Sequence, residues 1–119
     1  YVRSGSKDHG RKNQIEGKMD PGTKVVVVED LISTGGSVLE VVNVLREAGA
    51  EVLGIASIFT YGMKKGIERL AEANVKNVSL SNLDVLVEVA AKEGYIAEED
   101  VDRLLKFRDN PSDESWMQK

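Results

Sequence analysis

The stretch Lys24-Val25-Val26-Val27-Val28-Glu29-Asp30 decides the fold of this 119-residue chain. Its unbroken run of β-branched residues predicts a strand that is buried on both faces, as in a parallel sheet. From residue 37 to residue 48 the pattern changes, and hydrophobic residues recur every three or four positions. That period predicts a helix with one apolar face, which Gly49 can end.

The rest of the chain repeats this alternation. We expect strands at residues 52–60 and 77–80, and helices at residues 65–73, 83–92 and 98–108, with Ser81 or Asn82 as the N-cap of the second of these helices. The alternation predicts an α/β fold, a mostly parallel sheet flanked by helices and joined by right-handed crossovers. Ligands of such folds bind beyond the carboxyl ends of the strands.

The composition fits one globular domain, residues 1–119, that ends in a polar tail, residues 109–119. The chain is 41% hydrophobic and 30% charged and contains no cysteine, which excludes disulfides and thiolate-bound zinc. No apolar run approaches the roughly 20 residues of a membrane span. A formal net charge of -4 argues against general nucleic-acid binding, which needs a basic surface. We therefore expect a cytoplasmic protein with no membrane or nucleic-acid partner.

The beginning of the chain has a different chemistry. Tyr1-Val2-Arg3 has the character of the end of a strand and follows no methionine, so we expect a fragment. Basic residues and glycines, among them Lys7 and His9, lie between this stretch and residues 14–17. The two flanks predict a two-stranded antiparallel ribbon that carries a flexible basic loop. On composition alone such a loop is more often a solvated surface.

The strongest candidate site lies where the first strand gives way to the first helix. Gly35 and Gly36 allow successive backbone N–H groups to point into one concavity, and the hydroxyls of Ser33, Thr34 and Ser37 add further donors. Together with the positive end of the helix, these groups predict a phosphate cradle. The segment contains no Gly-Lys-Ser/Thr, which excludes a Walker A loop, and no G-x-G-x-x-G dinucleotide fingerprint.

Two acids stand directly before this turn. Glu29 and Asp30 would repel a bare anion, but they can accept hydrogen bonds from the hydroxyls of a sugar phosphate. A ribose 5-phosphate fits this combination of groups. The alternative is that Asp30 and residues 33–37 only form the turn and cap the helix, as such residues often do.

The quoted strand and turn, residues 25–37, resemble the 5-phosphoribosyl 1-pyrophosphate (PRPP) motif of type I phosphoribosyltransferases. Arg3-Ser4-Gly5-Ser6-Lys7-Asp8-His9-Gly10 resembles the catalytic loop of the orotate phosphoribosyltransferase family, and the similarity continues along essentially the whole chain. The resemblance implies the carboxy-terminal part of an enzyme of pyrimidine biosynthesis. That enzyme would use Mg²⁺ and transfer the 5-phosphoribosyl group of PRPP to orotate, giving orotidine 5-phosphate and pyrophosphate.

The resemblance also implies roles for individual residues. Arg3, Lys7, His9 and Asp30 would be catalytic, and the first three would grip the pyrophosphate from the neighbouring subunit of a homodimer. Mg²⁺ would be held mainly through PRPP, with no direct protein ligand. The implied substrate-binding set is Arg3, Lys7, His9, Glu29, Asp30, Leu31, Ile32, Ser33, Thr34, Gly35, Gly36 and Ser37.

The chain departs from the family pattern in three places. Ser4 and Gly5 stand where several members carry a second loop lysine, and Thr60-Tyr61 stands where many carry an orotate-binding arginine. Family chains also begin well before Tyr1. Two alternatives therefore stay open, a non-catalytic PRPP-sensing domain and an inactive structural fragment.

Overall fold

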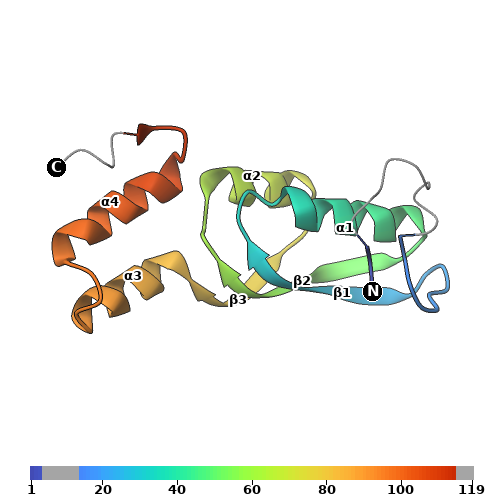
Figure 1. The fold of residues 1–119 in the computed structure, drawn as a ribbon. Coiled ribbons are helices and arrows are strands. Elements are labelled where there is room, and N and C mark those ends of the chain that lie inside the picture. The colour runs from blue at the N-terminus through green and yellow to red at the C-terminus, as the bar shows by residue number, and fades with distance from the viewer. Residues whose placement is uncertain (4–13, 115–119) are drawn as a thin grey trace.

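The computed structural model describes residues 1–3 and 14–114, and its elements alternate as the sequence predicts (Figure 1). In chain order they are β1 (Lys24–Ile32), α1 (Gly36–Glu47), β2 (Glu51–Thr60), α2 (Lys64–Glu72), β3 (Asn77–Asn82), α3 (Leu83–Lys92) and α4 (Glu98–Asp109). The Glu98–Asp109 helix carries acids in its first turn and bases in its last turn, which complements the helix dipole.

The three strands form one parallel sheet in the order β1-β2-β3. Val27 lies opposite Ile55 in the register, and Ser57 lies opposite Ser79. Helices α1 and α2 cover one face of this sheet (Figure 1). This arrangement confirms the predicted α/β class, and it brings the turns that follow β1 and β2 to the same edge of the sheet.

Strand β1 runs two residues further than the valine-rich stretch indicated. Leu31 pairs with Phe59 and Ile32 pairs with Thr60, so the sheet continues past Asp30. Helix α1 then begins at Gly36 and ends at Glu47, close to Gly49, which has a φ of 92°. Since only three residues separate strand from helix, the turn between them is tight.

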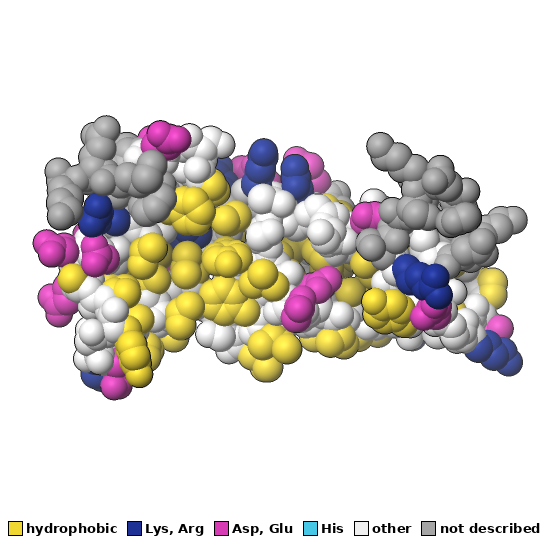
Figure 2. All heavy atoms as spheres, viewed as in Figure 1, with side chains coloured by type: hydrophobic (Ala, Val, Ile, Leu, Met, Phe, Trp, Pro, Cys, Tyr) yellow, Lys and Arg dark blue, Asp and Glu magenta, His cyan; other side chains and the backbone are white. Residues whose placement is uncertain are grey.

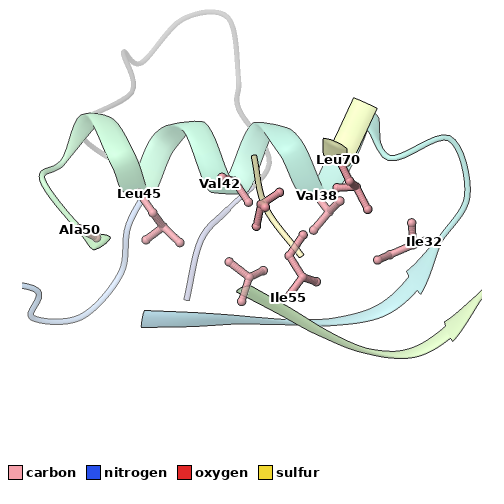
Figure 3. Close-up of a cluster of buried hydrophobic side chains, with 9 residues drawn as sticks. Ile32, Val38, Val42, Leu45, Ala50, Ile55 and Leu70 are labelled. Atoms are coloured by element: carbon pink, nitrogen blue, oxygen red, sulfur yellow. The ribbon is translucent and has the colours of Figure 1, made fainter. Parts of the chain in front are cut away.

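The core lies between α1 and the sheet (Figure 3). Val38 and Val42, on the apolar face of α1, are 2% and 0% exposed. The buried cluster consists of Val27, Ile32, Val38, Val42, Leu45, Ala50, Ile55, Leu70 and Val75. The hydrophobic residues that recur with the helical period in the sequence are therefore the residues of α1 that pack in the core. This core also supports the turn between β1 and α1.

The prediction that the first strand is buried on both faces was wrong for the described residues. Val26 and Val28 are 54% and 80% exposed, whereas Val27 between them is buried. The same open face carries Leu53, Ile58, Val78 and Leu80. Hydrophobic side chains reach the surface on the side of the sheet away from α1 and α2 (Figure 2). The reason is that no described element packs on this face.

Helices α3 and α4 extend the molecule beyond the end of β3 (Figure 1), and the principal extents are 53 × 27 × 23 Å. The Asn82 side chain accepts a hydrogen bond from the N–H of Val85 at 2.9 Å, so Asn82 is the N-cap of α3, as one of the two predicted alternatives. Within residues 1–3 and 14–114, no helix has the length and apolar character that a membrane crossing requires.

The amino-terminal residues contact the rest of the fold through one antiparallel bridge. Val2 pairs with Ile15, and the N–H of Arg3 donates to the carbonyl of Gln14 at 2.7 Å. Val2 and Ile15 also pack against the core cluster. This bridge lies where the antiparallel ribbon was predicted, and the loop that the ribbon would carry lies outside the described residues.

Candidate functional site

The turn between β1 and α1 presents backbone donors that no side chain caps. Gly35 is the N-cap of α1, with a φ of 83°, and no side-chain cap bond is made there. Among residues 1–3 and 14–114, no hydrogen bond is donated by the N–H groups of Thr34, Gly35 or Gly36. The structure thus shows no side-chain cap at the start of α1. A capping role therefore does not account for the small polar residues of this turn. The turn leaves a helix N-terminus of the kind that binds anions.

The two acids lie within the last residues of β1, immediately before this turn. Asp30 is exposed and Glu29 is half-buried, and the N–H of Asp30 donates to a carboxylate oxygen of Glu29 at 3.1 Å. Partial burial raises the pKa of Glu29, and the neighbouring Asp30 carboxyl raises it further, against the lowering effect of the Asp30 N–H. An arrangement in which ligand hydroxyls donate to the pair would relieve this repulsion.

The remaining predicted residues of the segment differ in what they offer a ligand. Ser33, Thr34 and Ser37 are exposed, and Leu31 is 46% exposed. Ile32 is 3% exposed and belongs to the core cluster, and its carbonyl accepts from the N–H of Tyr61 at 3.1 Å. The Ile32 side chain is therefore structural.

Helix α2 packs directly against the turn. A Cβ placed on Gly66 would lie 2.7 Å from the carbonyl oxygen of Ser33, and one placed on Gly35 would lie 3.4 Å from the Cα of Gly66. The Nη1 of Arg69 donates to the carbonyl oxygen of Thr34 at 3.1 Å. Two residues of α2, one helical turn apart, thus contact the backbone of the predicted phosphate turn.

A hollow of about 400 Å³ borders the same turn on the side where α2 begins. Thr34, Lys64 and Lys65 line it, together with Arg108 and the residues that follow α4. The Nζ of Lys64 lies 3.9 Å from the Oε1 of Glu68, and both side chains are largely exposed. The hollow therefore combines one residue of the turn with three cations and with two acids, Glu68 and Asp109.

The basic loop is represented in the described residues only by Arg3. The Arg3 guanidinium forms an ion pair with Glu16, with 62% of the Arg3 side chain exposed, and Gln14 donates to the Arg3 carbonyl at 3.3 Å. Gln14 lines a hollow that Gly36 also lines, and Glu16 lines a hollow that Glu29 also lines. Lys7 and His9 lie outside the described residues.

Thr60 and Tyr61, which stand where the resemblance implies an arginine in many members of the family, lie at the end of β2 and directly after it. Tyr61 packs edge-on against Phe59, with ring centroids 5.3 Å apart, and Thr60 accepts from the N–H of Gly62 at 3.2 Å. These residues form an ordinary strand-to-helix connection. In the described part of the chain, no three His, Cys, Asp or Glu side chains gather in a way that could hold a metal ion.

Gly66 and Arg69 were not predicted as site residues from the sequence. A glycine inside a predicted helix is unfavourable by about 1 kcal/mol relative to alanine, and such a position often marks a close approach of two backbones. That signal was present in Lys65-Gly66-Ile67. No comparable signal points to Arg69, because its contact depends on how α2 is placed over the sheet.

A family model described as the phosphoribosyl transferase domain matches residues 4–93. Curated relatives are named orotate phosphoribosyltransferase. The protein from Halalkalibacterium halodurans is 53% identical over 98% of this chain and 56% of its own length, and that from Bacillus cereus is 57% identical over the same shares. The chain therefore spans about half the length of the curated relatives it matches.

Solved structures of related enzymes are also similar to this chain. UMP synthase of Leishmania donovani has a TM-score of 0.70 at 27% identity, over 81% of this chain and 21% of its own. Orotate phosphoribosyltransferase of Mycobacterium tuberculosis, in a complex with PRPP, has a TM-score of 0.56 at 29% identity, over 69% of this chain and 45% of its own. With a turn of this geometry, a family model that covers most of the sequence and relatives above half identity, the chain belongs to the phosphoribosyltransferase family.

Proposed function

We propose that this chain supplies the PRPP-binding core of an orotate phosphoribosyltransferase. The observation that carries the proposal is the uncapped turn at Gly35, directly after the Glu29–Asp30 pair, in a chain whose curated relatives bear that enzyme name. The reaction transfers the 5-phosphoribosyl group from PRPP to orotate and releases pyrophosphate.

In this proposal the turn binds the phosphate of the ligand and the two acids bind its ribose. The N–H groups of residues 34–36 and the exposed hydroxyls of Ser33, Thr34 and Ser37 bind the 5-phosphate, at the positive end of α1. Glu29 and Asp30 accept hydrogen bonds from the 2- and 3-hydroxyls of the ribose. Exposure of Asp30 and partial exposure of Glu29 support this role, because both carboxylates remain within reach of a ligand.

The bond changes define what the other residues must do. The bond between the anomeric carbon and the pyrophosphate oxygen breaks, and its electron pair leaves with the pyrophosphate. N1 of orotate forms the new bond to that carbon and loses its proton, which the departing pyrophosphate takes up. Positive charge grows on the ribose and negative charge grows on the departing group. Fixed charges aimed at each therefore lower the barrier, and Asp30 fills this role on the sugar side.

The basic loop acts on the leaving group. We assign Arg3 and Lys7 to binding of the pyrophosphate and His9 to hydrogen bonding or protonation of it, from the neighbouring subunit of a homodimer.

The metal enters with the substrate in this proposal. Residues 1–3 and 14–114 contain no group of three or more His, Cys, Asp or Glu side chains that could hold a metal ion. Mg²⁺ would be held mainly through PRPP, and when bound it would offset negative charge on the leaving group.

The acceptor, orotate, is an anion and needs a cation near the anomeric carbon. Thr60 and Tyr61 do not supply it, but Lys65 lines the hollow next to Thr34 and makes no ion pair among the described residues. We assign Lys65 to the orotate carboxylate.

The proposal is tested by following orotate absorbance with PRPP and Mg²⁺, alongside calorimetric titration of PRPP. Loss of orotate supports the enzyme, whereas PRPP binding without turnover supports the sensing or incomplete fragment. Lys7→Ala should lower turnover by orders of magnitude and leave ribose 5-phosphate binding nearly intact. Lys92→Ala, an exposed lysine in α3 and outside the loop, is the matched control and should change neither. Absence of PRPP binding would remove the proposal altogether.

A further inference from the structure

We propose that α2 is the positioning element of the phosphate turn, with Arg69 and Gly66 holding two successive peptide planes so that their N–H groups face the ligand. This inference rests on the proposed function, because it names the residues that shape the same site. Neither residue belongs to the PRPP motif or to the basic loop.

The geometry of the peptide bond carries the first step. In a trans peptide the C=O and N–H groups point in opposite directions, and the described residues contain no cis bond. The guanidinium of Arg69 binds the carbonyl oxygen of Thr34 at 3.1 Å. That hydrogen bond turns the Thr34 carbonyl toward α2, and it therefore turns the N–H of Gly35 away from α2.

Gly66 controls the preceding peptide plane in the same way. The carbonyl oxygen of Ser33 lies 2.7 Å from the place that a Cβ on residue 66 would occupy, a distance that real Cβ atoms do not tolerate. The absence of a side chain lets this carbonyl approach α2. The N–H of Thr34, on the same plane, then also points away from the helix.

The charge of Arg69 adds to this effect. Its Nη1 lies 3.5 Å from the place of a Cβ on Gly36, the first residue of α1, so a fixed positive charge sits beside the turn. Hydrogen bonds to charged groups are stronger than those between neutral groups, and a guanidinium keeps its charge at any pH at which the protein folds. Arg69 thus pre-orders the turn before a dianionic phosphate arrives.

The chain contains a matched control for this residue. Arg46 of α1 donates to the carbonyl oxygen of Ala73 at 2.7 Å and to that of Asn74 at 3.4 Å, at the carboxyl end of α2. Arg46 and Arg69 therefore make the same kind of contact between neighbouring elements, but only the Arg69 contact reaches the phosphate turn.

The test is a calorimetric titration of ribose 5-phosphate into the unmodified chain and the variants Arg69→Met, Arg69→Lys, Gly66→Ala and Arg46→Met. We expect Arg69→Met to weaken binding about tenfold, the size of one charge-assisted hydrogen bond, and Arg46→Met to change it less than about twofold. Arg69→Lys should recover part of the loss, and Gly66→Ala should weaken binding even though alanine is the better helix former.

A readout without ligand separates positioning from general packing. In ¹⁵N-labelled protein the amide signal of Gly35 should move in Arg69→Met and stay in place in Arg46→Met, with melting temperatures lowered to a similar extent in both. Equal losses of affinity in the two arginine variants, or unchanged affinity in both, would overturn the role of α2 and leave the proposed function standing. If the unmodified chain binds no ribose 5-phosphate, the proposed function fails first and this inference falls with it.

Discussion

Arg108 donates from Nη1 to both carboxylate oxygens of Asp84, at 2.8 Å each, and so joins α4 to α3. The Arg108 side chain is only 14% exposed and also binds Asp109 at 2.7 Å. Burial acts to lower the pKa of Arg108, but its bonds to the two aspartates outweigh burial and raise it. The pair fixes the helical extension that lies beyond the sheet.

Arg108→Ala should loosen α4 from α3. We expect faster hydrogen exchange across α4 and a loss of about 1 kcal/mol in the free energy of unfolding. The loss is small for a charged hydrogen bond because Asp84 is half exposed and solvent screens the pair. Arg103→Ala is the control, because Arg103 pairs with Asp100 inside α4 at 2.9 Å. Equal exchange in both variants would show that the Arg108–Asp84 bond does not join the helices.

Val42→Ala should destabilise the chain much more than Val28→Ala. Val42 is 0% exposed in the core, whereas Val28 is 80% exposed on the open face of the sheet. Removal of two buried methyl groups costs about 2 kcal/mol, and the exposed substitution costs less than about 0.5 kcal/mol. Urea unfolding of both variants measures the difference, and similar losses would mean that the open face is covered in solution.

Asn82→Ala should destabilise α3 by about 1 kcal/mol, because the side chain that caps the N–H of Val85 is lost. Asn43→Ala, at an exposed position inside α1, is the matched control and should be neutral or slightly stabilising. Thermal unfolding of the two variants distinguishes a capping role from a general effect of removing asparagine, which would lower both melting temperatures alike.

Glu29→Gln should stabilise the chain at neutral pH relative to the unmodified protein. The pKa of Glu29 is raised in the folded state by burial and by Asp30, so the folded state holds its proton to higher pH than the unfolded state does. Stability is therefore lost as pH rises from the ordinary carboxyl pKa through the raised one. Glutamine does not ionise, so the Glu29→Gln variant does not lose stability in this way. Urea unfolding at mildly acidic and neutral pH should show a gain only at the higher pH, and a gain that does not change with pH would contradict this assignment.

The helices and strands could be predicted from the sequence because each of them has its own pattern of residues. The spacing of Val38, Val42 and Leu45 defines the buried face of α1, and Gly49 marks its end. Asn82 was one of two candidates for the cap of α3, and its side chain makes the bond. These features depend on residues close together in the chain.

Two features could not be read in this way because they depend on tertiary packing. A run of valines cannot reveal whether a second layer covers it, and Val26 and Val28 lie on an open face. The approach of Gly66 to Ser33 joins residues far apart in sequence, and it follows from the placement of α2 over the sheet. The candidate turn was predicted from its residue types, whereas the helix that shapes it became visible only in the fold.

The central claim is that the turn at residues 34–36 binds the phosphate of a ribose phosphate. A titration of ¹⁵N-labelled protein with ribose 5-phosphate, with ribose as the control ligand, tests it most directly. We predict saturable shifts of the Gly35 and Gly36 amide signals with the phosphate ester and none of that size with ribose. Shifts that cluster at another part of the chain, or equal shifts with both ligands, would contradict the account.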